Sequence, residues 1–291
     1  MIKQLTIIGV GLIGGSLARA LKQQGYCHEV VGCSRDRTHL QKALELGVID
    51  RFSTDVGEAI TGSDMIVVAV PLGAMESCFR SMVGHLSADA VITDAGSAKM
   101  CVIEAARAAF GELPAGFVPG HPIAGTEKSG VEASFAELYQ KRQVIITPVD
   151  ESAPEAIAKV RAMWEQTGAV VDEMEPSHHD EVFAATSHLP HLLAFSLVNT
   201  LVSMDESEEI FRFAASGFRD TSRIASSDPV MWRDIALANR DSILVMLDRY
   251  GRELELLKSA ILEADGEALK SSFARAKAAR DRFINQIENQ L

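Results

Sequence analysis

The sequence predicts an α/β fold in which a doubly wound parallel sheet is followed by an all-helical C-terminal domain. Up to about residue 174, apolar runs rich in β-branched residues alternate with helical patterns, the order typical of a mostly parallel sheet covered on both faces. From about Pro176 the strand patterns stop and helical patterns continue to the C-terminus. We therefore expect one domain over residues 1–174 and a helical domain over residues 175–291, a division that suits the chain length.

The first element is a strand over Leu5–Ile8, followed by a tight turn and a helix that begins near Leu12. Three glycines occupy this turn in a Gly-x-Gly-x-x-Gly pattern. The first lets the chain turn sharply, the second leaves room for a pyrophosphate, and the third lets helix and strand pack closely. The helix N-terminus adds N–H groups that favour phosphate, so the stretch predicts a Rossmann-type dinucleotide-binding domain. The cofactor-binding residues expected here are Gly9, Gly11, Leu12, Ile13 and Gly14.

The same stretch also allows a signal peptide or a membrane anchor, because Lys3 precedes a run that is uncharged until Arg19. The glycines would weaken a hydrophobic helix, and the run is shorter than the ~20 apolar residues that cross a bilayer. The four cysteines show no Cys-x-x-Cys spacing, and the sequence lacks a plausible secretion signal. Both observations favour reduced thiols in a cytoplasmic protein. We therefore expect a cytoplasmic protein that does not associate with a membrane.

Further strands and helices alternate along the first domain. Continuous apolar runs such as Met65–Pro71 are typical of strands that are covered on both faces. The later strands expected are Glu29–Ser34, Met65–Pro71, Ala90–Ser97, Phe117–Pro122, Gln143–Pro148 and Ala169–Met174. The helices expected between them include Thr38–Leu46 and Pro154–Gln166.

The C-terminal domain contains an apolar helix face. Apolar residues recur there at alternating spacings of four and three, which places them on one side of a helix. They are Ile243, Leu247, Tyr250, Leu254, Leu257 and Ile261. The face could pack inside its own domain or against a second subunit. Leu244, Met246 and Leu256 widen it, which favours a homodimer.

The formal net charge of −12 argues against a nucleic-acid-binding protein, because such a protein uses a basic face. A local basic pocket for a small anion is still compatible with this charge. We therefore expect a small molecule as the binding partner.

The choice between NAD and NADP depends on the end of the second expected strand. The residue about 20 positions beyond the last glycine meets the adenosine ribose, and here it is Ser34. An acidic residue would bind the ribose hydroxyls and repel a 2′-phosphate, whereas Arg35 could pair with that phosphate. Asp36 could still reach the ribose, so both cofactors remain open. Val70 and Pro71, at the end of another strand, are also expected to bind the cofactor.

Ligands of an open α/β sheet bind beyond the carboxyl ends of its strands, and two polar segments lie there. The segment Asp94–Lys99 places Ser97 after a strand, where its hydroxyl could cap the next helix or meet a ligand. The segment Gly120–Gly130 places His121 at another strand end, before a polar and glycine-rich loop. Since the reactive end of the cofactor belongs at this edge, we interpret His121 as functional rather than structural.

These segments make the chain resemble the prephenate dehydrogenase family, which includes arogenate and cyclohexadienyl dehydrogenases. The resemblance covers nearly the whole chain through four motifs in order. They are TDAGSAK (93–99), GHPIAGTEKSG (120–130), SHLPHLLAF (187–195) and GFRDTSRIASSDPVMWRDI (217–235). The resemblance implies oxidative decarboxylation of prephenate to 4-hydroxyphenylpyruvate with hydride transfer to NAD or NADP, a step of tyrosine biosynthesis.

The resemblance also implies roles for individual residues. His121 would meet the ring hydroxyl of the substrate, and Ser97 would help to hold that hydroxyl near the nicotinamide. A neutral histidine, with an ordinary pKa of about 6.5, suits proton acceptance near neutral pH. Arg223 would grip a substrate carboxylate through its planar guanidinium, and which carboxylate it holds is left open. The other substrate-binding residues expected are Thr126, Glu127, His188 and His191.

Alternative functions remain open. An arogenate or broad cyclohexadienyl dehydrogenase would accept the amino analogue of prephenate, and a non-catalytic nucleotide-binding sensor would keep the fold without the chemistry. A β-hydroxyacid dehydrogenase is more distant, because we find no catalytic lysine motif in the helical region. His178 and His179 beside Asp180, with His188 and His191 further on, could be mistaken for metal ligands. Hydride transfer needs no metal and no matching acidic or cysteine ligands accompany these residues, so we expect none.

The chain departs from the family pattern in two respects. Ser34 stands where many relatives have an acidic residue, which leaves cofactor selectivity open. We also expect neither a chorismate mutase segment before the glycine motif nor a regulatory domain after Leu291. Any inhibition by tyrosine should therefore act at the active site or in the interdomain cleft.

Overall fold

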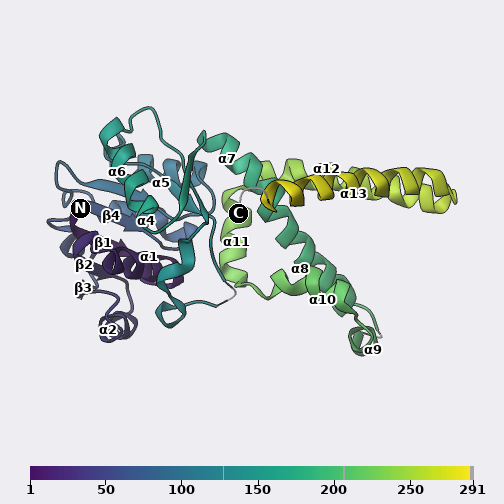
Figure 1. Ribbon diagram of the computed structural model, residues 1–291, viewed down its shortest axis with the longest axis horizontal. Helices are drawn as coiled ribbons and strands as arrows, with labels where there is room; N and C mark the ends of the chain where they lie inside the picture. The colour runs from purple at the N-terminus through teal and green to yellow at the C-terminus, as the bar shows by residue number, and fades with distance from the viewer. Residues whose placement is uncertain (127, 206, 289–291) are drawn as a thin grey trace. The chain divides into compact units, whose positions relative to one another are not determined.

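The computed structural model describes residues 1–126, 128–205 and 207–288. The chain divides into two compact units, Met1–Arg240 and Asp241–Leu291, and the fold of each can be followed in Figure 1. The first unit extends beyond the sheets to Arg240, because the helices between the last strand and Arg240 pack together with the sheet region. None of the described helices is long and apolar enough to cross a membrane.

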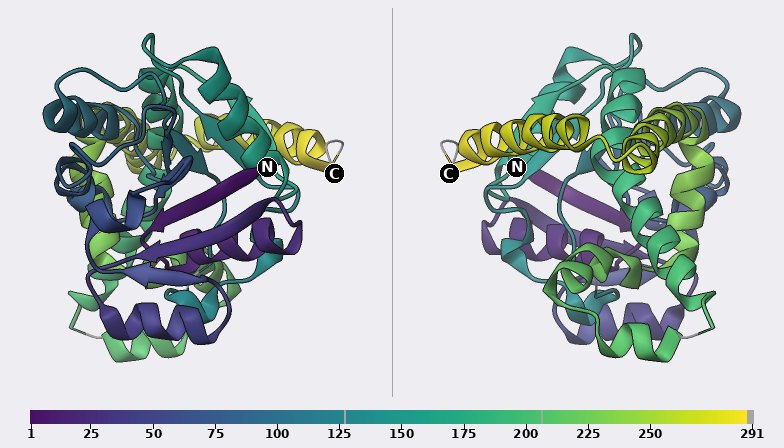
Figure 2. Two further views of the ribbon diagram at one scale, coloured as in Figure 1. Left: turned by 90° about the vertical axis from the view of Figure 1, so that its left-hand side faces the viewer. Right: turned by 90° about the vertical axis from the view of Figure 1, so that its right-hand side faces the viewer.

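A five-stranded parallel sheet of order β3-β2-β1-β4-β5 forms the centre of the first unit (Figure 2). Its strands are β1 (Ile2–Ile8), β2 (Cys27–Cys33), β3 (Arg51–Ser53), β4 (Met65–Val68) and β5 (Val91–Asp94). β4 is buried along its whole length, as its continuous apolar run predicts. The predicted doubly wound parallel sheet is therefore confirmed.

Helices cover both faces of this sheet. Successive side chains of a strand point to opposite faces, so Ile7 packs in one core cluster and Ile8 in the other. The helices of the first cluster are α1 (Leu12–Gln23), α2 (Arg37–Glu45) and α6 (Pro154–Glu165). The helices of the second are α3 (Val56–Ile60), α4 (Met75–Arg80) and α5 (Met100–Phe110). Short 3-10 turns are η1 (Leu72–Ala74), η2 (Val131–Ala133) and η3 (Ala136–Tyr139).

A second, three-stranded sheet follows, of order β6-β7-β8. Its strands are β6 (Gly120–Pro122), β7 (Gln143–Ile146) and β8 (Val170–Glu173). β6 and β7 run antiparallel, a pairing that the alternating sequence pattern did not reveal. The cause lies just before β6. Val118 still donates its N–H to the carbonyl of Ile92 in β5, whereas the N–H of Gly120 turns to the side chain of Asp94.

Beyond Glu173, the described residues contain helices and no strand, as the sequence predicts. These helices are α7 (Pro176–Phe183), α8 (Leu189–Val202), α9 (Ser207–Arg212), α10 (Ser216–Ser222), α11 (Pro229–Ala238), α12 (Arg240–Leu262) and α13 (Gly266–Glu288). A π-helical turn, η4 (Ala184–His188), joins α7 to α8, and a 3-10 turn, η5 (Arg223–Ser226), follows α10. Pro190 follows this π-helical turn within an unbroken helical run, where a proline has no N–H to donate to the preceding turn.

Candidate active site

The glycine-rich turn after β1 has the geometry that a dinucleotide needs. Gly9 has φ +96°, and a Cβ on it would lie 2.3 Å from the carbonyl oxygen of Ala69. A Cβ on Gly14 would lie 2.3 Å from the carbonyl oxygen of Gly9, so this glycine is required for close packing of helix and strand. A Cβ on Gly11 would meet nothing within 4 Å. Gly11 therefore presents an open surface at the N-terminus of α1, which fits the approach of a pyrophosphate.

The residues expected near the adenosine ribose lie at the carboxyl end of β2. Ser34 is half-buried and Arg35 is exposed. The carboxylate of Asp36 accepts two N–H groups in the first turn of α2, at 2.8 and 3.2 Å. Asp36 therefore caps that helix through Oδ1, beside Ser34 and Arg35. Val70 is half-buried and Pro71 exposed at the carboxyl end of β4.

His121 lies on β6 and is 9% exposed. Its Nδ1 is 2.9 Å from Nε2 of His179, and Nδ1 of His179 is 2.8 Å from Oδ1 of Asp180. The ring of Phe183 packs against both imidazoles, with centroids 4.8 Å from His121 and 4.4 Å from His179. Strand β6 and helix α7 thus place three hydrogen-bonding side chains in one buried row.

The two imidazoles of this row are neutral at neutral pH. Burial lowers the pKa of His121 well below its ordinary value of 6.5, and the neighbouring His179, Lys99 and His188 lower it further. Burial also lowers the pKa of His179, although its hydrogen bond to Asp180 opposes the shift. A neutral imidazole has one ring nitrogen with a lone pair, so His121 is able to accept a proton.

Asp180 is held at the N-terminus of α5. Its Oδ1 accepts the N–H of Lys99 at 2.7 Å, and its Oδ2 accepts the N–H of Met100 at 2.9 Å. Burial raises the pKa of this carboxyl, but hydrogen bonds from His179 and from these N–H groups outweigh burial and bring the pKa below its ordinary value. Asp180 therefore caps α5. Ser97, for which the sequence allowed a capping role, makes no such bond and lies half-buried in the preceding turn.

A buried ion pair holds the residue that precedes His121. Nζ of Lys99 donates to Oδ2 of Asp94 at 2.5 Å and to the carbonyl oxygen of Gly120 at 2.6 Å. The N–H of Gly120 donates to Oδ1 of Asp94 at 3.1 Å, and both charged side chains are 0% exposed. The pair thus engages both backbone polar groups of Gly120 and fixes the start of β6.

A second group of predicted residues gathers around Trp232. The ring of His191 stacks on Trp232 with centroids 3.7 Å apart, and its Nδ1 donates to the carbonyl oxygen of Ser187 at 2.9 Å. Burial lowers the pKa of His191, and the positive charge of Arg223 lowers it further. Arg223 itself is exposed on η5. The structure therefore places Arg223 near His191 and stacks Trp232 on the same imidazole.

His188, predicted to bind the substrate, is almost fully buried, with 1% of its surface exposed. Its Nδ1 accepts a hydrogen bond from Nδ2 of Asn239 at 3.1 Å, and the same amide donates to the carbonyl oxygen of Asp180. Burial lowers the pKa of His188 to about 4. Its Nε2 is a buried atom with no hydrogen-bond partner among the described residues. Asn239 therefore links His188 to the row that contains His121.

The loop after β6 holds the remaining predicted residues. Thr126 is exposed, and its Oγ1 accepts the N–H of Lys128 at 3.2 Å. It borders an open hollow of about 260 Å³ together with Glu137 and Arg142. Glu127 lies outside the described residues. No cluster of three or more histidine, cysteine or acidic side chains able to hold a metal is found in the part of the chain that the structure describes.

His179, Asp180 and Asn239 are the residues of this site that the sequence did not reveal. His179 and Asp180 drew attention only as unlikely metal ligands, and nothing in the local pattern marks Asn239. Their one common signal is polarity within a helix or directly after one whose other buried residues are apolar, as with Phe183 in α7 and Ile235 in α11. Such a signal is weak, because a polar side chain in a helix usually faces water.

Two family models match consecutive parts of the chain. The nucleotide-binding domain of prephenate dehydrogenase matches residues 17–173, and the dimerization domain of prephenate dehydrogenase matches residues 175–275. The cyclohexadienyl dehydrogenase of Zymomonas mobilis is 38% identical over 285 residues, which cover 96% of this chain and 95% of that protein. The prephenate dehydrogenase of Bacillus subtilis is 38% identical over 291 residues, which cover 95% of this chain and 75% of that protein.

The fold is also similar to a solved structure that contains a ligand and a cofactor. This is prephenate dehydrogenase from Aquifex aeolicus in complex with hydroxyphenyl propionate and NAD+. The TM-score is 0.90 at 36% sequence identity, over 97% of this chain and 99% of that one.

Proposed function

The chain belongs to the prephenate dehydrogenase family, and from this we propose that it converts prephenate to 4-hydroxyphenylpyruvate and carbon dioxide with hydride transfer to NAD. The observation that best supports this reaction is the buried, neutral imidazole of His121 at the edge of the nucleotide-binding domain. The reaction needs a proton acceptor there, because the substrate hydroxyl must release its proton as the adjacent carbon loses hydride.

His121 takes the catalytic role in this proposal. Its Nε2 accepts the proton of the ring hydroxyl, and Ser97 orients that hydroxyl through its own side chain. When bound, NAD supplies the nicotinamide ring that takes the hydride from the carbinol carbon. The electron pair of the ring-to-carboxylate bond moves into the ring as carbon dioxide leaves. His121 then returns its proton to the oxygen, which becomes the phenol of an aromatic product.

Arg223 and His191 form the substrate-binding side of the site. An exposed guanidinium beside a stacked imidazole can hold a carboxylate with two parallel hydrogen bonds. Too strong a grip on the departing carboxylate would stabilise the ground state as well as the transition state. We propose that Arg223 holds a carboxylate of the substrate, with His188, Thr126 and the loop residue Glu127 as the other contacts.

The cofactor site comprises the glycine turn and the ends of β2 and β4. Its proposed residues are Gly9, Gly11, Leu12, Ile13, Gly14, Ser34, Arg35, Val70 and Pro71. The open surface at Gly11 supports a bound pyrophosphate. The absence of an acidic side chain at position 34, with Arg35 exposed next to it, supports the use of NADP as well as NAD. We propose residues 1–174 as the cofactor domain and 175–291 as the substrate and dimerization domain, because the two family models meet between residues 173 and 175. A cytoplasmic location remains a prediction.

The first experiment measures absorbance at 340 nm with prephenate and either NAD or NADP. We expect reduction of at least one cofactor by the wild-type protein. In a Gly11→Ala variant, the KM for the cofactor should rise about tenfold or more with little change in Tm, since the added Cβ contacts no protein atom and blocks only the ligand. No reduction with either cofactor, while the protein is folded, would contradict the proposed reaction.

A broad cyclohexadienyl dehydrogenase is the second candidate function. The Zymomonas mobilis relative, which aligns along 95% of its own length, carries that name. The same absorbance assay with arogenate in place of prephenate separates the two, because a broad enzyme would reduce the cofactor with both substrates. Activity with arogenate alone would instead assign the chain to the amino substrate.

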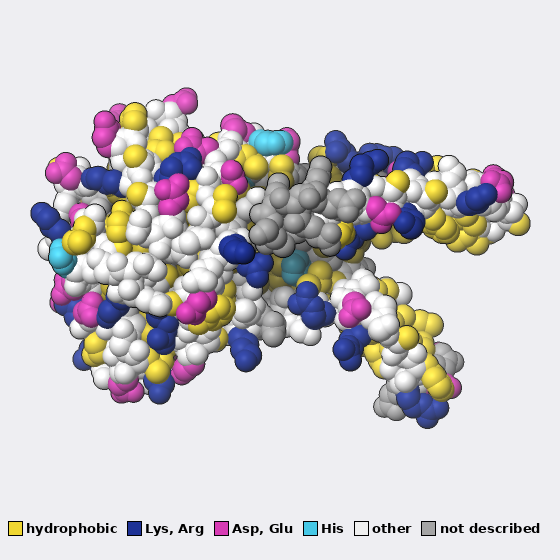
Figure 3. All heavy atoms as spheres, viewed as in Figure 1, with side chains coloured by type: hydrophobic (Ala, Val, Ile, Leu, Met, Phe, Trp, Pro, Cys, Tyr) yellow, Lys and Arg dark blue, Asp and Glu magenta, His cyan; other side chains and the backbone are white. Residues whose placement is uncertain are grey.

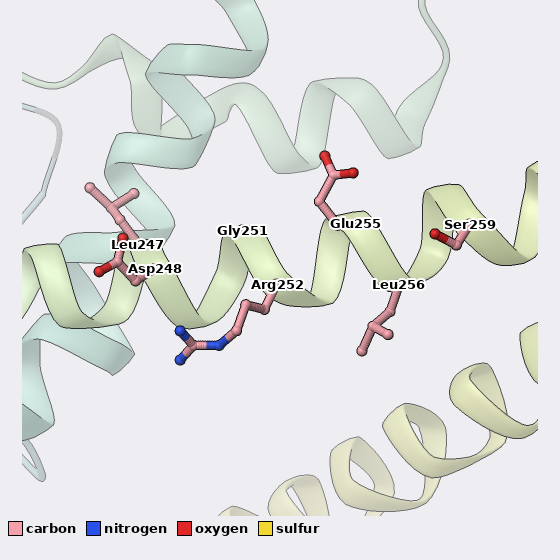
Figure 4. A pocket seen from close by; sticks show the side chains of 7 residues that line it. All are labelled: Leu247, Asp248, Gly251, Arg252, Glu255, Leu256 and Ser259. Carbon is pink, nitrogen blue, oxygen red and sulfur yellow. The ribbon is translucent and has the colours of Figure 1, made fainter.

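We propose that the chain forms a homodimer through the apolar face of α12. Residues 175–275 match a dimerization domain, and three of the predicted face residues, Leu247, Leu254 and Ile261, are 36%, 47% and 65% exposed. Figure 3 shows hydrophobic side chains gathered along α12 and α13. An open hollow of about 610 Å³ runs along α12 and is lined in part by Leu247 and Leu256, whose side chains are labelled in Figure 4.

Sedimentation of the purified protein tests this arrangement. We expect a species of two 31.4 kDa chains. Replacing both Leu254 and Ile261 with aspartate should convert the dimer to a single chain, because the two negative charges would be buried in an apolar interface without a positive partner. A Val83→Asp variant, which changes an equally exposed residue of the first unit, serves as the control. A wild-type protein that sediments as one chain would exclude the homodimer.

A further inference from the structure

We infer that His179 and Asp180 are positioning residues, which hold His121 in the tautomer that carries hydrogen on Nδ1 and leaves Nε2 to accept the substrate proton. The inference rests on the proposed role of His121. It follows from the order of donors and acceptors along the buried row of three side chains.

The row begins at Asp180, whose carboxylate can only accept hydrogen bonds. Its two oxygens already accept the N–H groups of Lys99 and Met100, which keep it ionised and fix its orientation at the start of α5. The third bond, from Nδ1 of His179 at 2.8 Å, must therefore be donated by the imidazole. Nδ1 of His179 thus carries hydrogen.

The next step follows from the neutrality of His179. A neutral imidazole with hydrogen on Nδ1 has a lone pair on Nε2, so Nε2 of His179 is an acceptor. The atom 2.9 Å away is Nδ1 of His121, which must then donate. The reverse direction would require hydrogen on both nitrogens of His179, and burial disfavours that cation.

The remaining nitrogen of His121 is therefore the proton acceptor. Nε2 makes no hydrogen bond among the described residues, and unlike Nε2 of His188 it is not a fully buried atom, so it is left open to a ligand. The contacts of Phe183 with both rings restrict their rotation, so the tautomer and the direction of the lone pair are set before the substrate binds.

The same row compensates for the charge that develops on His121. Burial and the neighbouring His179, Lys99 and His188 all oppose a positive charge there when those groups are themselves charged, but His179 is neutral and Lys99 is paired with Asp94. Once Nε2 has taken the hydroxyl proton, Nδ1–H of the imidazolium still points at His179, and His179 points at the Asp180 carboxylate. The negative charge thus reaches the imidazolium through one neutral ring, as an oriented carboxylate does in other acid–base groups.

Nitrogen-15 NMR of histidine in the wild-type protein tests the tautomer without reference to any activity. We expect the His121 signals of a neutral ring with hydrogen on Nδ1 and none on Nε2, assigned by comparison with a His121→Asn variant. A neutral ring with hydrogen on Nε2 would overturn the inference. Because this measurement needs no substrate, its failure is distinct from failure of the proposed reaction.

Two variants test the functional consequence. His179→Phe keeps a buried ring but removes the acceptor, and we expect kcat for prephenate to fall about thirtyfold with less than a threefold change in KM. His179→Gln retains a carbonyl acceptor and should recover part of this loss. The control is His178→Gln on the same helix, whose side chain is 61% exposed and should leave kcat unchanged.

The variants also distinguish positioning from a structural role. A structural role would lower activity in proportion to the folded fraction and leave the NMR tautomer of His121 in place. We expect instead that His179→Phe shifts His121 toward the tautomer with hydrogen on Nε2. The variant should also change the pH at which kcat falls on the acidic side of its pH profile. Unchanged kcat and pH profile in a folded His179→Phe protein would overturn the inference.

Discussion

Replacing His121 with asparagine is expected to lower kcat for prephenate about a thousandfold, because the variant has no lone-pair nitrogen to take the hydroxyl proton. The KM values for prephenate and for the cofactor should change little, since His121 acts on charge that develops only in the transition state. Asparagine is smaller and polar, and its amide can still donate toward Nε2 of His179. Steady-state kinetics at 340 nm with saturating cofactor measure the effect.

The pH dependence of the wild-type enzyme belongs to the same prediction. Only neutral His121 accepts a proton, and its pKa lies well below 6.5 because the ring is buried. The profile of kcat/KM, which reports the free enzyme, should therefore stay level down to pH 6.5 and fall only at lower pH. A level profile in the asparagine variant is the control, and an acid limb centred above pH 6.5 in the wild type would contradict the assignment of His121.

Replacing Asp94 with asparagine is expected to destabilise the first unit by about 3–5 kcal/mol. The substitution leaves the ammonium of Lys99 fully buried without its counter-ion, and removing one partner of a buried pair carries a cost of this size. Urea unfolding followed by circular dichroism gives the change in free energy. Activity should fall as well, since the pair holds the backbone of Gly120 beside His121.

Two comparisons make this second experiment decisive. Glu76→Gln breaks an ion pair with Arg80 whose side chains are 51% and 56% exposed, and it should cost less than about 1 kcal/mol. Combining Asp94→Asn with Lys99→Met removes the buried cation and should recover a large part of the lost stability. A loss below about 1 kcal/mol in the single variant would show that the buried pair contributes little.

The sequence by itself determined the class of fold and the presence of a nucleotide-binding domain. The turn at Gly9, Gly11 and Gly14 was predictable because the spacing of its glycines can be read along one short stretch. Gly9 and Gly14 leave no space for a Cβ, and Gly11 lies open at the start of α1. The change from strands to helices near Pro176 was predictable because side-chain periodicity is also local. His121 could be selected in the same way, as a polar residue at a strand end.

Only the tertiary structure decided what surrounds His121. His179 and Asp180 are distant from it in the chain, and a one-dimensional pattern does not record which strand end a helix will pack against. The same holds for the cap of α5, which Asp180 supplies in place of the nearby Ser97. Hydrogen bonds of buried polar groups are satisfied by whichever partner the packing brings near, so the row from Asp180 to His121 exists only once α7 has packed beside β6 and the start of α5.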